Sequence, residues 1–262
     1  AGRIAGAKKF GNCWTLPANA AKPCDPRSAR KAETAAYTFL PAIALPKEDA
    51  DGALKALRGD RLALAAADVA YRRGDTAPAK TYWYETAHTA ADLLSAAALA
   101  TAAAISSGDY ALYYAVRGVL DGCAAGADER TAALLSLPQT LAAVSMALPD
   151  MTPDWLKACD FSLFPAALRP FLFYLFAMHL RNTNDRAGQL STARTTVLLC
   201  QREDTFTWLD VNLYLLCASA CFALRDAAGA ALYLRRALRL GLPCGFIMPF
   251  ADHLGEFGGM ME

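Results

Sequence analysis

The fold of this chain is best read from residues 220–243, whose sequence is ACFALRDAAGAALYLRRALRLGLP. An apolar run ends at the polar pair Arg225–Asp226, and a second apolar-periodic run follows until a proline closes it. Small, large and small residues recur in the second run at Ala230, Leu234 and Ala237, which is the spacing of one helix face. The stretch therefore predicts a helical hairpin, two helices joined by a tight turn.

The same kind of turn recurs along the chain. Gly74–Asp75 and Gly108–Asp109 each separate two apolar-periodic segments, and Asn184–Asp185 does so later. Gly or Asn can take the left-handed conformation that ends a helix, and the next Asp can accept hydrogen bonds from the free N–H groups of the following helix. These turns predict helices over 61–73, 77–89, 92–107 and 110–122, and a further one over 206–224.

The spacing of the turns indicates a repeat. The two Gly-Asp turns lie 34 residues apart, which is the period of tetratricopeptide repeats (TPRs). The interval from Asp109 to Asp185 leaves room for two more units, the middle one over Asp128–Leu148 followed by a short helix near Pro153–Phe161. We therefore predict an all-α fold over residues 47–245, a right-handed TPR-like superhelix of about five stacked hairpins, with no β-rich stretch.

Residues 1–46 differ from the rest of the chain. They contain five prolines and an excess of basic side chains, which predicts an irregular leader with one short helix near Ala29–Phe39. We consider two alternatives, a cap packed over the first repeat and a linker to an upstream domain. The cap is favoured because Phe10, Trp14, Tyr37 and Phe39 are large enough to gain from burial.

The composition is that of a globular protein without a strong charge. Of the 262 residues 55% are hydrophobic, and 26 basic against 25 acidic residues leave a net charge of +1, which offers no footprint for nucleic acid. The N-terminus lacks the apolar core of a signal peptide, and the densest apolar run, Phe171–Met178, is too short for a bilayer span of about 20 residues. We expect a cytoplasmic chain that binds no membrane.

The cysteines and histidines predict no metal site, no cofactor and no catalysis. Eight cysteines lack a paired CxxC spacing, and eight thiols without a secretion signal suggest a reducing cytoplasm. Cys217 and Cys221 share one helix face, where a metal or redox pair is an alternative to the favoured packing role. His179 and His253 have no partner at a telling spacing, and GxxxxGK[ST], GxGxxG, HExxH and GxSxG are absent. An all-helical enzyme is therefore the least favoured class of function.

Aromatic clusters are the best candidates for a ligand or partner surface. Consecutive aromatic residues on a helix cannot all face the core, so at least one per cluster should be partly exposed and could form an aromatic wall beside a cation. The alternative, packing between repeats, is the commoner use of such residues. The candidate residues are Tyr82, Trp83, Tyr110, Tyr113, Tyr114, Arg117, Trp208 and Asn212.

The C-terminal tail carries a family resemblance. After the last predicted hairpin the chain reads GFIMPF at Gly245–Phe250, followed by Gly255 and the pair Met260–Met261. This pattern resembles the end of the repeat region in bacterial regulators of the LuxR family, MalT-like branch, where a Gly-aromatic-x-x-Pro-Phe tract follows the last hairpin. The resemblance covers roughly residues 47–262.

The resemblance implies a sensor or interaction region that precedes a helix-turn-helix domain. The sequence stops at Glu262 before any basic recognition helix, so we expect a fragment of a regulator, with residues 246–262 as a capping segment or the start of a linker. Its partner would be a protein or small-molecule effector, with self-association as a further option, and DNA would bind only through a domain outside this chain. The rival hypothesis is a freestanding TPR-type scaffold that binds a peptide or protein in its concave groove.

Overall fold

The computed structural model divides the chain into two compact units, residues 1–36 and 37–262. In the first unit the structure describes one antiparallel strand pair, β1 (Lys8–Phe10) with β2 (Cys13–Thr15). The helix predicted near Ala29–Phe39 lies outside the described residues, apart from Phe39, which is not helical. The described residues are 8–10, 13–15, 39, 45–46, 50–86, 88–89, 91–200 and 205–257.

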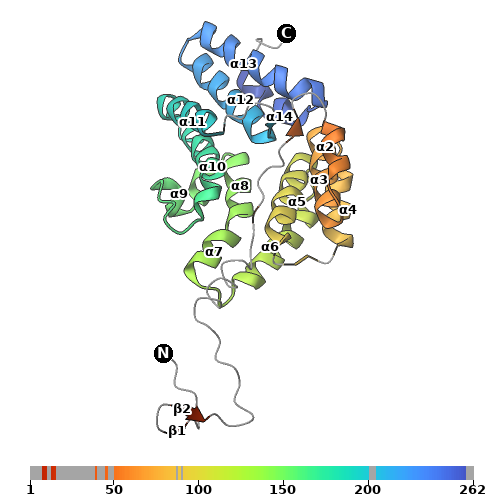
Figure 1. The fold of residues 1–262 in the computed structure, drawn as a ribbon. Coiled ribbons are helices and arrows are strands. Elements are labelled where there is room, and N and C mark those ends of the chain that lie inside the picture. Colours follow the sequence, from red (N-terminus) through yellow and green to blue (C-terminus); the bar gives the residue numbers. More distant parts are fainter. Residues whose placement is uncertain are drawn as a thin grey trace. The chain divides into compact units, whose positions relative to one another are not determined.

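The second unit is mostly helical, which confirms the all-α prediction at the level of secondary structure (Figure 1). Short 3₁₀ turns lie at Pro149–Met151, Ala166–Leu168 and Leu242–Cys244. The helices are α2 (Ala50–Ala56), α3 (Asp60–Arg72), α4 (Ala77–Glu85), α5 (Leu93–Ser107), α6 (Tyr110–Ala124), α7 (Glu129–Leu135), α8 (Leu137–Ser145), α9 (Asp154–Lys157), α10 (Arg169–Asn182), α11 (Arg186–Cys200), α12 (Trp208–Ala223), α13 (Ala227–Gly241), α14 (Met248–Ala251) and α15 (Leu254–Phe257).

No β-rich stretch interrupts the described helices, as expected, although one short strand pair is present. Strand β3 (Leu45–Pro46) pairs with β4 (Thr205–Phe206) in antiparallel register. Only two residues of each strand take part, so no periodicity in the sequence could have indicated the pair. It joins the beginning of the second unit to the residues just before α12.

The predicted turns have the predicted conformation. Gly74, Gly108, Asn184 and Arg225 all have positive φ angles, between 63° and 97°. The aspartate after each one accepts a backbone hydrogen bond of 2.9–3.1 Å from the first turn of the next helix, at Ala77, Leu112, Gly188 and Gly229. The left-handed residue and the aspartate cap therefore end one helix and begin the next, as the sequence indicated.

These turns join helices that pack in consecutive pairs, α3 with α4, α5 with α6, α10 with α11, and α12 with α13. On α13 the residues predicted to face the core, Ala230, Leu234 and Ala237, are buried. One boundary differs, because α4 ends at Glu85 and not at Thr89. The backbone is extended at Thr86, and the His88 ring stacks on Trp83 at 4.8 Å in place of continuing the helix.

The middle of the domain departs from a regular pair. Asp128 caps α7 by accepting a 2.7 Å hydrogen bond from the Thr131 amide, at the predicted position. Pro138 then stands in the first turn of α8, where its missing N–H costs nothing, so α7 and α8 follow one another with a break at Ser136. The short helix expected near Pro153–Phe161 is present as the four residues of α9.

The tail packs back on both ends of the helical array. Its amide at Ile247 donates a 2.7 Å hydrogen bond to the carbonyl of Arg72 at the end of α3, and Arg73 Nε donates to the Cys244 carbonyl at 3.0 Å. On α13, a Cβ added to Gly241 would lie 2.9 Å from the Phe250 ring, so this close approach requires glycine. The tail therefore links the last helix pair to the first.

Candidate ligand-binding site

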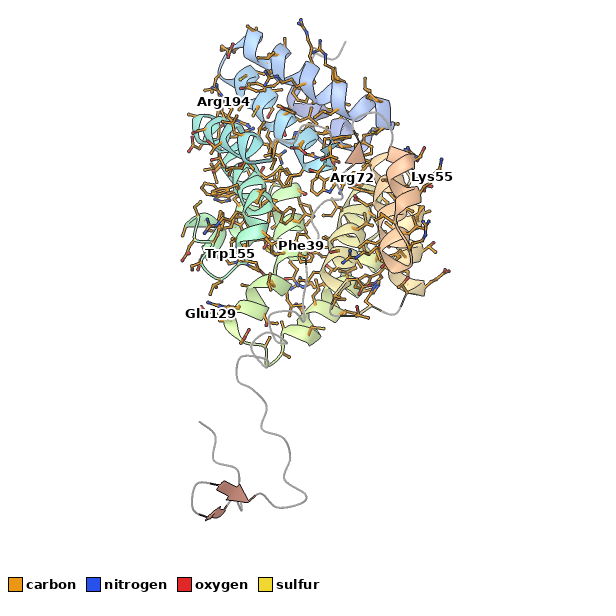
Figure 2. The ribbon with its side chains drawn as sticks, in the orientation of Figure 1. Phe39, Lys55, Arg72, Glu129, Trp155 and Arg194 are labelled. Atoms are coloured by element: carbon orange, nitrogen blue, oxygen red, sulfur yellow. The ribbon has the colours of Figure 1, made fainter. Side chains whose placement is uncertain are left out.

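A small pocket forms where α3, α5, α8, α10 and α12 meet the turn between α14 and α15. Its volume is about 110 Å³, of the order of the roughly 150 Å³ cavity that admits a benzene ring in a well-studied protein core. Figure 2 shows Arg72, one of its residues, where α3 meets the C-terminal helices. We call it the inner pocket; it is lined by Tyr71, Arg72, Ala102, Ile105, Ser106, Leu141, Ser145, Tyr174, Met178, Arg181, Trp208, Asn212, Asp252 and His253.

One side of the inner pocket is an aromatic wall that holds a cation. The rings of Tyr174 and Trp208 lie edge to face, with centroids 5.7 Å apart. The Arg72 guanidinium lies 4.1 Å from the Trp208 ring and 4.8 Å from the Tyr71 ring, and its Nε and Nη2 donate to Asp68 Oδ1 at 3.2 and 3.0 Å. These cation–π and ion-pair contacts fix the guanidinium although the residue is buried.

The opposite side is a charge cluster contributed by α10 and the tail. Arg181 Nη1 donates to Glu256 Oε1 at 2.7 Å, and His253 Nδ1 lies 3.5 Å from the same oxygen. Burial alone would raise the pKa of Glu256, but the neighbouring His253 ring and the Arg181 guanidinium outweigh it and lower that pKa to about 2. Glu256 is therefore an anion that holds α15 against α10.

Asp252 is the carboxylate of the site that is not committed to such a pair. In the described part of the chain it makes no ion pair within 4.0 Å. Removal of water by the surrounding protein raises its pKa, against the lowering influence of His253, Arg72 and Arg181. Asp252 lines the inner pocket and keeps part of its surface exposed to solvent although its carboxyl group is largely surrounded by protein.

The polar groups of the inner pocket are held by contacts within the protein. The Tyr71 hydroxyl and Ser106 Oγ are 2.9 Å apart, and Asn212 Nδ2 donates to the Trp208 carbonyl at 3.1 Å. These contacts orient hydroxyl and amide groups beside the Arg72 guanidinium and the aromatic rings; a few polar groups in an apolar lining are common in sites for small organic molecules.

No metal-binding constellation is formed by the described residues, since they contain no group of three or more His, Cys, Asp or Glu side chains placed to hold an ion. Burial, with the neighbouring Cys221, raises the pKa of the Cys217 thiol to about 12, so this thiol stays protonated at neutral pH. Likewise, among the described helices none is long and apolar enough to cross a membrane.

The sequence-predicted site residues are divided among three places. Trp208 and Asn212 line the inner pocket. Tyr82 and Trp83 are each only 7% exposed, so they contribute little surface of their own, although Tyr82 lines an open groove of about 690 Å³ between α3 and α4. Trp83 is covered by the stacked His88 ring, and the Tyr82 hydroxyl donates to Asp92 at 3.3 Å.

The remaining predicted residues lie on a second surface. Tyr110 and Tyr114 are 75% and 64% exposed, while Tyr113 and Arg117 line a hollow of about 60 Å³. Exposed Met146, Leu148 and Met151 adjoin them. We call this surface the outer patch; it consists of Tyr110, Tyr113, Tyr114, Arg117, Met146, Leu148 and Met151.

Most residues of the inner pocket escaped the sequence reasoning. Tyr71, Arg72 and Tyr174 belong to runs that read only as helix faces, and Asp252 lies in the tail, far from them in sequence. The signals available were an arginine pair closing an apolar helix and a histidine in the tail. Neither signal indicates which residues lie beside it in the pocket, because those residues come from other helices.

Comparison of the chain with protein-family models, with curated proteins and with solved structures found no match. The geometry of the inner pocket and of the tail therefore carries the functional argument, with the resemblance of the tail to LuxR-type regulators as a prediction from sequence.

Proposed function

We propose that this chain is a non-catalytic signal-sensing domain that binds a small polar effector in its inner pocket. In this proposal the paired helices form a right-handed TPR-like superhelix of about five hairpins, which the 34-residue turn spacing supports. The effector carries a donor group for Asp252 and an acceptor group for the Arg72 side. A volume of about 110 Å³ suits a small molecule or one end of a larger molecule.

The observation that carries the proposal is the origin of the pocket residues. Tyr71 and Arg72 end α3, the first helix of the first pair, whereas Asp252 and His253 belong to the tail, which is held on α3 by the Ile247–Arg72 hydrogen bond. A ligand that contacts both sides stabilises their association, and a domain attached after the tail would feel that change. This is the coupling that a transcription regulator needs between its sensor and a helix-turn-helix domain.

The test is a screen of amino acids, sugars, nucleosides and organic acids by thermal shift, with hits confirmed by calorimetry. We expect at least one class of small polar compound to raise the melting temperature by several degrees when present at 100 times its Kd, since such binding adds about 2.7 kcal/mol. Asp252→Ala and the pocket-filling Ser145→Phe should abolish the shift. Arg117→Ala, in the outer patch, is the matched control and should keep it.

The regulator part of the proposal has its own test. The native gene read beyond the codon of Glu262 should encode a helix-turn-helix with a basic recognition helix, and the longer protein should bind promoter DNA in an effector-dependent way. If the protein binds an effector but has no such segment, the sensor function stands and the regulator function is refuted.

A second candidate function is a scaffold that binds an extended peptide. One observation favours it: the main chain at Leu45–Pro46 lies along Thr205–Phe206 as an added strand, which is one of the ways in which proteins bind peptides. It differs from the sensor hypothesis in the ligand, a peptide in place of a small molecule.

A further inference from the structure

The beginning of the second unit makes two separate contacts with the helical array. The Phe39 side chain is 8% exposed, and its ring lies 4.8 Å from the ring of Phe171 at the start of α10. Six residues later, Leu45 pairs with Phe206 and Pro46 with Thr205. Figure 2 shows Phe39 between the two sides of the helical array. An aromatic anchor followed by main-chain pairing is how an extended peptide is held on a protein.

The surface that receives Phe39 is held together by contacts of its own. The Phe171 ring packs against Tyr174 and Trp208, with centroids 6.1 and 6.5 Å apart. All three rings come from α10 and α12, which pack directly on each other. The Phe171, Tyr174 and Trp208 rings therefore pack on one another without Phe39. We expect another aromatic side chain to be able to take the place of Phe39 against Phe171.

The edge that receives Leu45–Pro46 is also fixed independently. Phe206 packs on Phe246 of the tail at 6.1 Å. Thr207 begins α12 with a capping box, in which its amide and hydroxyl donate to Asp210 Oδ2 at 2.7 and 2.8 Å. The backbone at Thr205–Phe206 is thereby held in place by α12 and the tail, whereas a two-residue strand pair is by itself a weak attachment.

We propose that this face, formed by Phe171, Trp208 and the edge Thr205–Phe206, is a docking site for an extended peptide with an aromatic anchor, and that the chain's own Phe39 and Leu45–Pro46, here called the resident segment, are its present occupants. The inference rests on the second candidate function and names its partner. A partner peptide displaces the resident segment by offering an aromatic side chain to Phe171 and main-chain groups to Phe206. Because Trp208 also lines the inner pocket, exchange at this face alters one wall of that pocket.

The test uses the full chain and a fluorescein-labelled synthetic peptide of residues 37–48, with binding followed by anisotropy. In the unaltered chain the tethered segment competes at an effective concentration on the order of millimolar, so the labelled peptide should bind weakly. Phe39→Ala weakens the resident segment and should tighten binding of the peptide at least tenfold. A peptide with alanine in place of its phenylalanine should bind the same variant at least tenfold more weakly.

Tyr110→Ala, which removes an aromatic ring from the outer patch, is the matched control and should behave as the unaltered chain. Equal binding by the Phe39→Ala variant and the unaltered chain would overturn the proposal. Selection of peptides from a displayed library on the Phe39→Ala variant then tests the scaffold function separately from the resident occupant. Library peptides that bind where the chain's own peptide does not would leave the scaffold function standing and refute the resident occupant; no binder of either kind would refute both.

A second measurement applies if Phe39→Ala does not fold. Hydrogen exchange of the unaltered chain compares the amides of Phe39 and Leu45 with that of Leu213, which is fully buried in α12. An exchangeable occupant opens without unfolding the helices, so the two segment amides should exchange at least 100-fold faster. Equal rates would make the segment an integral part of the core and overturn the proposal.

Discussion

The inner pocket and the outer patch are both rich in aromatic residues, but they differ in what surrounds the rings. In the inner pocket, the buried rings of Tyr71 and Trp208 pack on the Arg72 guanidinium, and the buried Tyr174 ring packs on Trp208. In the outer patch, Tyr110 and Tyr114 are mostly exposed, and the cation Arg117 forms only an exposed pair with Asp121 at 3.4 Å. The same residue types therefore contribute to stability and ligand orientation in one place and to an accessible surface in the other.

The difference teaches that aromatic content alone does not identify a site. Buried rings lose their freedom when the protein folds and position neighbouring polar groups, whereas exposed rings keep their apolar surface for a partner. Four variants, ordered by the size of the expected effect, test this contrast.

The largest effect is expected from Trp208→Ala. The side chain is 6% exposed and packs against Phe171, Tyr174 and Arg72, so its loss should lower the free energy of unfolding by about 3–5 kcal/mol. Urea denaturation followed by circular dichroism measures this change. Tyr110→Ala in the outer patch should change it by no more than about 0.5 kcal/mol. A comparable loss in both variants would remove the distinction between the two regions.

The next effect concerns acid stability. The pKa of Glu256 is about 2 in the folded protein, against 4.5 ordinarily, which corresponds to about 3 kcal/mol of stability. Because the folded pKa is lowered, this stability is complete above about pH 5 and is lost as the pH falls towards 2. Glu256→Gln should lower the stability at neutral pH and flatten this part of the pH profile, as measured by urea denaturation from pH 7 to pH 2.

Two comparisons sharpen this experiment. Asp252, whose pKa is raised, titrates with the opposite sign and is present in both proteins, so the difference between the profiles isolates Glu256. Asp121→Asn removes the exposed charge beside Arg117 in the outer patch and should leave the acid loss unchanged. An unchanged profile in the Glu256→Gln variant would show that the Arg181–Glu256 pair does not hold the tail.

A smaller effect is expected from Tyr71→Phe, which removes the hydroxyl bonded to Ser106 and keeps the ring. Leaving the Ser106 hydroxyl without its partner should cost about 0.5–1.5 kcal/mol, measured by thermal unfolding. The matched change in the outer patch, Tyr114→Phe, should have no measurable effect because that hydroxyl faces water. If Tyr71→Phe is equally silent, the hydrogen bond does not contribute to the wall of the inner pocket.

The smallest effect on stability is expected when Tyr113 and Arg117 are both replaced by alanine. Both line the hollow of the outer patch, and their removal should lower the melting temperature by no more than about 1–2 °C. Binding of a protein partner that uses the outer patch should weaken in the same variant, as measured by calorimetry. A much larger loss of melting temperature would place these two residues in the core.

Local rules account for the elements that the sequence predicted correctly. At Gly74, Gly108, Asn184 and Arg225, a left-handed residue followed by aspartate ends one helix and begins the next. The spacing of Ala230, Leu234 and Ala237 likewise defines a buried face on one helix. Such patterns predicted the helical class and most helix positions, but placed the end of α4 four residues too late.

For the candidate site the sequence was a weaker guide. It singled out Trp208 and Asn212, but it also singled out Tyr82 and Trp83, which the fold buries beneath His88 and beside Asp92. Whether a tyrosine on an amphipathic helix packs or stays exposed depends on the neighbouring helix, which periodicity does not name.

By itself the sequence determined that this protein is a series of capped helices, because helix ends and helix faces depend on residues a few positions apart. Only the tertiary structure decided that the tail returns to α3 and that Arg72, Arg181 and Asp252 surround one pocket. The β3–β4 pair was decided in the same way. These contacts join residues more than 70 positions apart, and their energies depend on distance and burial in space, which no local pattern encodes.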